Sequence, residues 1–312
     1  MAGGDIMKKY VLVFSGQGSE RIGMFNDMLK EPGLLNQTLD TLNEQLSLDL
    51  RDIVTTKDAA VVAKNNQILL SIYHQLVAKL VTEKIGYSPM FCMGHSFGQF
   101  SALVSSGAVK FVDMVRFINK RTEIINSDDI EVKATFKSIH GMALEEFESF
   151  RNEEGLAGQV ELALQNQKEQ IVCAATKSGE EKLNNLSGKY SYVLKDVNVS
   201  RPYHTLFMEE YNQRLLPYVD NLEFLTPECP IVLNNSKKPI TDNKLLQEET
   251  KIQMIKPVFW YDSIMNITDE VDAFVIIDPS ETQSKILRRI TDKKIHNLNN
   301  WGAIKMIEKK GV

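Results

Sequence analysis

The chain has few of the features that mark secreted, metal-binding or membrane-spanning proteins. It contains only 3 cysteines, Cys92, Cys173 and Cys229, which lie far apart in the sequence without CxxC or His-Cys spacing. This scarcity argues against a disulfide framework or a structural metal site and favours a reducing, cytoplasmic compartment. No apolar run approaches the roughly 20 residues of a membrane-spanning helix. The opening MAGGDIMKKY lacks the apolar segment of a signal peptide, and Met7 within it is a candidate natural first residue.

The chain also lacks an excess of positive charge. Its 36 basic and 41 acidic side chains give a formal net charge of −5, which argues against binding to nucleic acid or to an anionic membrane. No internal repeat or low-complexity tract stands out. With 43% hydrophobic and 25% charged residues over 312 positions, the chain has ample material for a large core. We expect one large domain that carries a smaller insert.

Short apolar runs alternate with longer amphipathic stretches along most of the chain. Runs that read as buried strands lie at 10–14, 90–93, 230–234 and 273–278, and helical patterns cover 58–84, 111–126 and a stretch that begins near His204. Strands that alternate with helices predict an α/β protein with a mostly parallel sheet.

Residues 131–195 follow a different pattern. The strand-like runs VKATFKSI, VELAL, QIVCAA and YSYVL alternate with the helical segments ALEEFESFRN and GEEKLNNL. This β-α-β-β-α-β order predicts a small ferredoxin-like α+β subdomain. We therefore place this subdomain at 131–198, inserted into a larger α/β domain made of 1–130 and 199–312.

The segment GHSFG, residues 94–98, joins a short apolar run to an amphipathic stretch. A strand that runs directly into a helix through Gly-x-Ser-x-Gly forms a turn so tight that side chains at the flanking positions would collide. The serine, Ser96, is then left at the helix N-terminus, where free N–H groups favour developing negative charge. A chance spacing of two glycines around a serine is the alternative, and the strand and helix on either side disfavour it. We interpret Ser96 as a nucleophile.

A serine nucleophile needs a positioned base, usually a histidine. Of the five histidines, His95 adjoins the serine and reads as structural support, while His74 lies among apolar residues of a helical pattern. His140 lies in an expected turn, and His296 in the polar segment DKKIHNLNN. His204 lies two positions after Pro202, which fixes the backbone at the start of a helix and suits a side chain that must be aimed. The residues alone leave open whether His204 is the base.

Five motifs in one order resemble the malonyl-CoA:acyl carrier protein transacylase family: FSGQGSE, GHSFGQ, NKRTEII, VSRPYHTLFM and QMIKPVFWYDSI. The resemblance covers nearly the whole chain. The family includes fatty-acid transacylases and the freestanding acyltransferases that serve polyketide synthases in trans. It implies an α/β-hydrolase-like catalytic core with a small ferredoxin-like subdomain, and a ping-pong acyl transfer through a seryl ester.

The resemblance also implies roles for individual residues. Ser96 matches the acylated nucleophile, and His204 matches the general base. Gln17 and the backbone N–H of Phe97 match the oxyanion hole. Gln253 matches the residue whose backbone carbonyl orients the histidine, in the place that an aspartate takes in other triads.

Arg121 and Asn166 match residues of the family's substrate pocket. Arg121 lies 25 positions after Ser96, as the family pattern requires. A guanidinium holds a carboxylate through two parallel hydrogen bonds, and a malonyl group has a free carboxylate whereas an acetyl group has none. Without the resemblance, a surface arginine beside Lys120 would be the simpler interpretation.

Several positions depart from the family pattern. Gln99 stands in place of a usual glutamate, Ser15 in place of a frequent proline, and DPSETQ at 278–283 in place of a Gly-Pro-Gly type turn. These departures favour a specialised freestanding polyketide enzyme over a housekeeping one. Tyr203 is similar to the phenylalanine that precedes the catalytic histidine in malonyl-selective relatives. Its hydroxyl leaves open a polar α-substituent, such as hydroxy- or aminomalonyl.

We expect a monomer that binds no metal or cofactor, uses malonyl-CoA or a related extender thioester, and acylates the phosphopantetheine thiol of an acyl carrier protein. Carrier proteins are acidic, so Lys237-Lys238 and the segment 285–294 are candidate docking surfaces, with solvated helix faces as the alternative. Two other functions stay open. Arg121 disfavours an acyl hydrolase that clears carrier proteins, and the intact Ser96 and His204 disfavour a non-catalytic docking protein.

Overall fold

The computed structural model describes residues 8–312 except 31, 47–48, 87, 128 and 132, so the proposed natural start at Met7 lies outside the described residues. The strands are β1 (Tyr10–Phe14), β2 (Phe91–Gly94), β3 (Thr135–His140), β4 (Val160–Gln167), β5 (Gln170–Ala175), β6 (Val193–Val197), β7 (Ile231–Val232), β8 (Pro239–Ile240), β9 (Ala273–Ile277) and β10 (Lys294–Asn297). The helices are α1 (Gly33–Leu46), α2 (Arg51–Thr55), α3 (Ala59–Lys64), α4 (Asn66–Ile85), α5 (Gly98–Ser105), α6 (Phe111–Ile125), α7 (Leu144–Glu153), α8 (Lys177–Tyr190), α9 (Glu209–Asp220), α10 (Asn243–Ile252), α11 (Trp260–Thr268), α12 (Thr282–Leu287) and α13 (Trp301–Lys310).

A six-stranded sheet in the order β10-β9-β1-β2-β7-β8 forms the centre of the larger part of the molecule. All its neighbouring strands are parallel except β8, which runs antiparallel to β7. Every residue of β1 is buried, as expected for a strand covered on both faces. The sheet brings the ends of β1 and β2 together, and the loops that follow these two strands carry Gln17 and Ser96.

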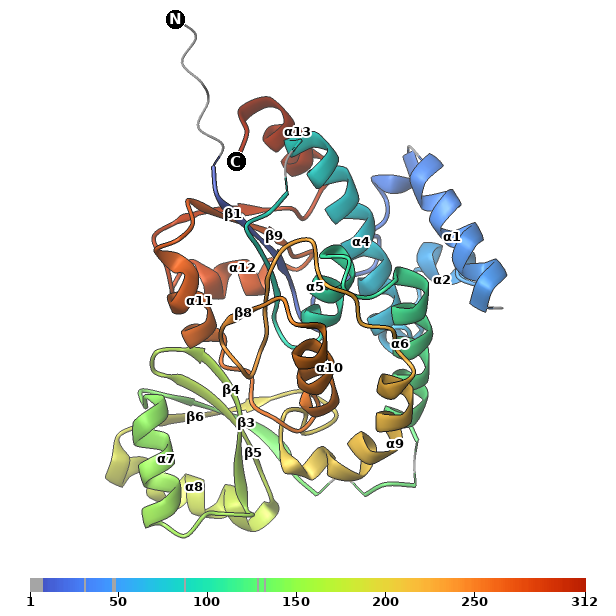
Figure 1. Cartoon of the computed structure of the whole chain (residues 1–312). Coiled ribbons are helices and arrows are strands. Elements are labelled where there is room, and N and C mark those ends of the chain that lie inside the picture. Colours follow the sequence, from blue (N-terminus) through green and yellow to red (C-terminus); the bar gives the residue numbers. More distant parts are fainter. Residues whose placement is uncertain (1–7, 31, 47–48, 87, 128, 132) are drawn as a thin grey trace, which may run out of the picture.

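Helices cover both faces of this sheet (Figure 1). Alternate β1 residues Tyr10, Leu12 and Phe14 belong to a core with helices α4, α5, α6 and α13. Val11 and Val13 point to the opposite face, where they join a core with α11 and α12. The strand's two-residue side-chain period thus supplies both cores. Within the described residues, no helix has the length and apolar character needed to cross a membrane.

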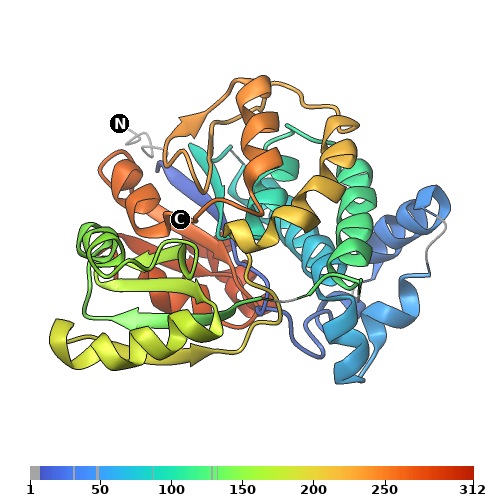
Figure 2. The same ribbon diagram turned by 90° about the horizontal axis from the view of Figure 1, so that it is seen from below.

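A second sheet, antiparallel and in the order β4-β5-β3-β6, lies beside the first (Figures 1 and 2). Together with α7 and α8 it has the β-α-β-β-α-β order of a ferredoxin-like fold. Phe147 and Leu183 from the two helices pack against one face of this sheet, while Phe136 and Ala174 on the other face join the main core. The expected fold class is confirmed, and the boundaries at 131 and 198 stay a prediction.

A short segment after α10 connects the two sheets. Val258 forms a parallel bridge with Leu164 of β4. The backbone N–H of Gln165 donates to the Val258 carbonyl at 2.8 Å, and the Val258 N–H donates to the Ala163 carbonyl at 2.9 Å. The second sheet is therefore hydrogen-bonded directly to the segment that contains Gln253.

The structure corrects one local expectation, at His296, and adds detail to others. The pattern at 58–84 divides into α3 and α4, which meet at Asn65. The segment that contains His296 is not a solvated tail, because β10 pairs with β9 there. The helix expected near His204 begins only at Leu206, with a 3-10 turn that leads into α9. The fold also brings the distant Cys92 and Cys229 together, with 3.4 Å between their sulfur atoms and no disulfide.

Candidate active site

The turn between β2 and α5 is as tight as the Gly-x-Ser-x-Gly spacing predicts. A Cβ atom on Gly94 would lie 2.0 Å from the backbone carbon of Gly98, and one on Gly98 would lie 2.3 Å from the Phe14 carbonyl oxygen. Only glycine fits at either position, because backbone atoms cannot move aside as a flexible side chain can. Ser96 between them has a φ of 51°, a left-handed conformation that is uncommon for a residue with a side chain.

The turn brings the Ser96 hydroxyl against a histidine that lies 108 positions further along the chain. The Ser96 Oγ and His204 Nε2 atoms are 2.6 Å apart, and the His204 Nδ1 atom is 2.9 Å from the Gln253 carbonyl oxygen. Because a carbonyl only accepts, Nδ1 carries the proton and Nε2 is left to accept from the serine. The Gln253 side chain also donates to the Ser96 carbonyl at 3.1 Å. One residue therefore holds both the serine and the histidine.

The backbone at His204 is held in an unusual conformation. Its φ is 65°, and its N–H donates to the Met254 carbonyl at 2.7 Å. Burial lowers the pKa of His204 to about 3, and interactions with the charges of His95 and Arg121 contribute to this decrease. The hydrogen bond to the Gln253 backbone opposes it, because it raises the pKa. The imidazole is neutral at pH 7 and able to accept a proton.

Asn234, which the sequence reading did not single out, braces the turn from the neighbouring strand. It accepts from the Ser96 N–H at 2.8 Å and donates to the Gly94 carbonyl at 2.6 Å. Its own N–H donates to the Gln99 side chain at 2.9 Å, which gives the glutamine at the family's usual glutamate position a structural role. The sequence shows only that Asn234 ends the apolar run 230–234, and the pairing of β7 with β2, which brings it to Ser96, appears in the structure alone.

His95 and Asn166 lie together beside the serine. The His95 Nε2 atom is 3.0 Å from the Asn166 side-chain oxygen, and the His95 ring packs edge-on against Trp260 with centroids 5.1 Å apart. Burial lowers the pKa of His95 to about 4. Asn166 thus contacts the site through His95, and the residue of β4 that lines the cavity is Leu164.

A cavity of about 410 Å³ opens in front of the serine and the histidine. Arg121, which extends from α6, is only 3% exposed and lines this cavity. Its guanidinium carbon lies 5.5 Å from the ring centroids of both Phe100 and Tyr203. Burial lowers the pKa of Arg121. A cation at this depth, in a cavity with a nucleophile, is an arrangement that favours an anionic ligand.

Only some of the N–H donors of the Arg121 guanidinium have hydrogen-bond partners. Its Nη1 donates to the Gln67 side-chain oxygen at 2.6 Å, whereas its buried Nε has no partner among the described residues. A buried donor without a partner is costly. The arrangement therefore leaves donors free for a ligand carboxylate.

The two expected oxyanion-hole residues both line the cavity. Gln17 lies in the loop after β1, and its side-chain oxygen accepts from the Gln67 amide at 3.1 Å. Phe97 follows the serine at the start of α5, and its backbone N–H has no hydrogen-bond partner in the described part of the chain. Tyr203 lines the same cavity, and burial raises the pKa of its phenol while the Arg121 charge opposes that rise.

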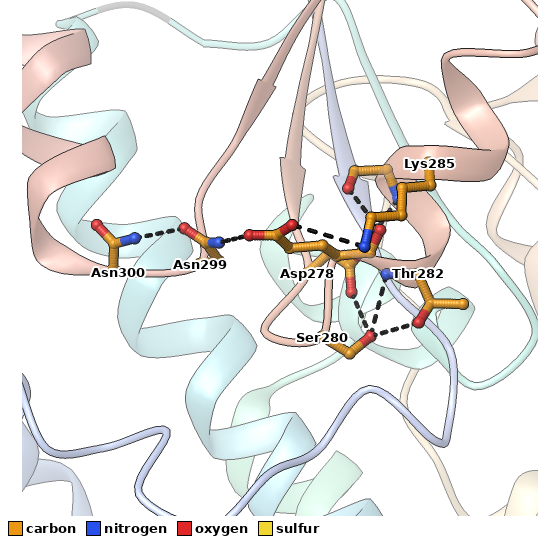
Figure 3. A network of polar contacts seen from close by, with 8 residues as sticks. Asp278, Ser280, Thr282, Lys285, Asn299 and Asn300 are labelled. Carbon is orange, nitrogen blue, oxygen red and sulfur yellow. Dashed lines mark hydrogen bonds and ion pairs between the residues drawn. The ribbon is translucent and has the colours of Figure 1, made fainter.

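Ser15 and the segment 278–283, which depart from the family pattern, both take part in hydrogen bonds within the fold. Ser15 and Ser101 lie 3.1 and 2.9 Å from the two ring nitrogens of His74, and burial lowers the pKa of this histidine to about 3. The turn after β9 is held by side chains in place of glycines (Figure 3). Asp278 there accepts from the Ser284 N–H at 2.9 Å.

Two of the candidate docking residues, Lys237 and Lys285, already have partners in the structure. Lys237 lies 2.9 Å from Asp262 and 3.9 Å from the Phe259 ring centroid. Lys285, in the segment 285–294, lies 3.8 Å from Glu281. Over the residues that the structure describes, no group of three His, Cys, Asp or Glu side chains is arranged to hold a metal ion.

Known proteins with similar sequences and folds share one enzymatic description. The family model described as "Acyl transferase domain" matches residues 11–298. A malonyl CoA-acyl carrier protein transacylase of Bacillus subtilis (strain 168) is 28% identical over 290 residues, 91% of each chain. The transacylase of the same name from Staphylococcus aureus (strain MSSA476) is 23% identical over 309 residues, which cover 96% of this chain and 98% of that one.

Two solved structures have the same fold at lower sequence identity. A malonyl-transacylase in complex with a type II PKS acyl-carrier protein has a TM-score of 0.87 at 24% identity, covering 96% of this chain and 99% of that one. The malonyl CoA-acyl carrier protein transacylase of Coxiella burnetii has a TM-score of 0.88 at 22% identity, covering 97% and 98%. At these identities the likeness demonstrates the fold.

Proposed function

The chain belongs to the acyl transferase domain family, and from this membership we propose that it transfers a malonyl group from coenzyme A to an acyl carrier protein through an ester on Ser96. The observation that carries the proposal is the meeting, in one cavity, of the Ser96–His204 pair at 2.6 Å and the buried Arg121. The names of the relatives supply the malonyl thioester and the carrier protein as substrates.

In the first half-reaction, the Ser96 oxygen attacks the thioester carbonyl while its proton passes to His204 Nε2. The Gln253 carbonyl stabilises the resulting imidazolium through Nδ1–H. The free N–H of Phe97, helped by Gln17, donates to the oxyanion. The C–S bond then breaks, the coenzyme A thiolate takes the proton from His204, and malonyl-Ser96 remains.

Arg121 selects the malonyl group by its charge. A carboxylate at the free edge of the guanidinium receives charge-assisted hydrogen bonds from donors that otherwise stay unpaired in a buried site. An acetyl group leaves the same cation without a counter-ion. The charge therefore favours dicarboxylic acyl groups over neutral ones.

In the second half-reaction, the phosphopantetheine thiol of the carrier protein attacks malonyl-Ser96. His204 takes the thiol proton and returns it to the Ser96 oxygen as the ester breaks. These steps use side chains and backbone groups of this chain alone, so we propose that no bound cofactor takes part. We also propose a cytoplasmic, freestanding polyketide enzyme, which the unpaired cysteines and the departures at Ser15, Gln99 and 278–283 support.

Intact-protein mass spectrometry tests the proposal. The protein is incubated with malonyl-CoA or acetyl-CoA and then with a phosphopantetheinylated carrier protein of the polyketide or the fatty-acid type. We expect a long-lived malonyl adduct that is absent from Ser96→Ala and that moves to the carrier, faster to the polyketide type. Rapid release of free malonate without an adduct would indicate an acyl hydrolase instead.

A further inference from the structure

We propose that Gln67 is a positioning residue that sets the orientation of both Arg121 and Gln17, and so couples recognition of the substrate carboxylate to the oxyanion loop. This inference rests on the proposed function. Gln67 lies in the first turn of α4, outside every motif that identified the site, and does not line the cavity itself.

A single amide group connects the two residues. The Gln67 side-chain oxygen accepts from Arg121 Nη1 at 2.6 Å, and the Gln67 side-chain nitrogen donates to the Gln17 side-chain oxygen at 3.1 Å. Gln67 is 3% exposed, so water does not compete freely for either hydrogen bond. The connection joins α6, α4 and the loop after β1, which are distant in sequence.

The direction of these hydrogen bonds follows from their chemistry. A guanidinium can only donate, so the oxygen of Gln67 must face Arg121 and its nitrogen must face Gln17. The Gln17 oxygen is then turned toward Gln67, which leaves the Gln17 N–H groups for the cavity side. The fixed charge of Arg121 thus sets the orientation of two amides in succession.

The same contact limits how Arg121 can meet a ligand. With Nη1 held by Gln67, the donors left for a carboxylate are Nη2 and the unpaired Nε, which form one edge of the guanidinium. A carboxylate bound at that edge has a defined direction relative to the Ser96 oxygen. Without Gln67, the guanidinium can turn and Gln17 loses the hydrogen bond that directs its side-chain oxygen away from the cavity, while its side-chain contact with Tyr203 remains.

The experiment compares loading of Ser96 by malonyl-CoA and acetyl-CoA in the full-length protein and in Gln67→Leu, Gln67→Glu and Gln75→Leu. Gln75 is the matched control, because it lies on the same helix and uses its amide for two hydrogen bonds to α5, with Ser101 and Ser105 at 3.0 and 2.9 Å. Thermal unfolding of each variant shows whether it is folded.

We expect Gln67→Leu to slow malonyl loading about 10- to 100-fold, the range of a hydrogen bond to a charged group, and acetyl loading by less. The malonyl-to-acetyl ratio therefore falls. Gln67→Glu retains an acceptor for Arg121 but adds a charge that competes with the substrate carboxylate, so its ratio falls even if Gln67→Leu does not fold. Gln75→Leu keeps the parent ratio.

Two results would overturn the role of Gln67. One is a ratio within about twofold of the parent protein in the folded Gln67 variants, and the other is an equal loss in Gln75→Leu, which would indicate general loosening of α4. A parent protein that never forms the Ser96 adduct would instead overturn the proposed function, and this inference with it. The parent measurement therefore separates the two failures.

Discussion

Arg121→Met is expected to convert a malonyl-selective site into one that prefers neutral acyl groups. Methionine keeps much of the arginine stem between Phe100 and Tyr203 but removes the charge and the donors. Breaking a buried ion pair by removing one partner costs about 3–5 kcal/mol. Malonyl loading should therefore fall on the order of 10²- to 10⁴-fold, since each 1.36 kcal/mol in the barrier is about tenfold in rate.

Acetyl loading should not fall, because the acetyl group makes no hydrogen bond that the substitution removes. Arg121→Lys should give an intermediate result, since an ammonium keeps the charge but cannot reproduce the planar fork. Arg116→Met is the matched control on the same helix, where the Arg116 side chain is 58% exposed and pairs with Asp113. It should change neither rate.

The assay measures the initial rate of adduct formation on Ser96 with each thioester over a range of concentrations. Comparison of kcat/KM for the two donors isolates the effect on selectivity from any general loss of activity. The reasoning is wrong if Arg121→Met keeps its malonyl preference, or if it slows loading from both thioesters equally. The second result would show that Arg121 supports the fold of the cavity and does not recognise the carboxylate.

The glycine geometry and the buried histidines give two further predictions. Gly98→Ala should destabilise the protein by at least about 3 kcal/mol, because its Cβ would meet the Phe14 carbonyl at 2.3 Å. Gly188→Ala, in α8 with no atom near the added Cβ, should stabilise it by up to about 1 kcal/mol; equal urea midpoints for the two variants would contradict this account. Acidification should also destabilise the fold, because burial lowers the pKa of His74 and His204 to about 3 and of His95 to about 4. The unfolded chain protonates its histidines below about pH 6.5, while the folded state keeps these three neutral. The free energy of unfolding is therefore highest above pH 6.5 and decreases as the pH falls toward 4. On the order of 2 kcal/mol per histidine should be lost by pH 5, and urea unfolding curves that coincide at pH 7 and pH 5 would refute this.

Local patterns predicted the parts of the fold where sequence neighbours determine the structure. The fully buried β1 and the tight turn at Ser96 follow from short apolar runs and from glycine spacing. The strand β10 was missed, because KIHN carries a charge and a histidine and pairs only at the sheet edge. His204 was expected at the start of a helix, yet its backbone is left-handed and is held by Met254.

The sequence predicted those residues of the candidate site that lie within the family's motifs. The motifs identify Ser96 and His204, and the structure brings them to hydrogen-bonding distance. The residues that hold them in place, such as Asn234 and Gln67, could not be found in this way. They act through contacts across 138 and 54 positions of sequence, respectively, and a single sequence does not show which distant side chains meet.

The bridge between Val258 and β4 ties the small sheet to the catalytic base. Gln253, only five residues earlier, holds the His204 ring through its carbonyl. The orientation of the imidazole therefore depends on how the small sheet packs against the segment 253–258, and a substitution that breaks the Val258 bridge should disturb the catalytic base without touching the cavity.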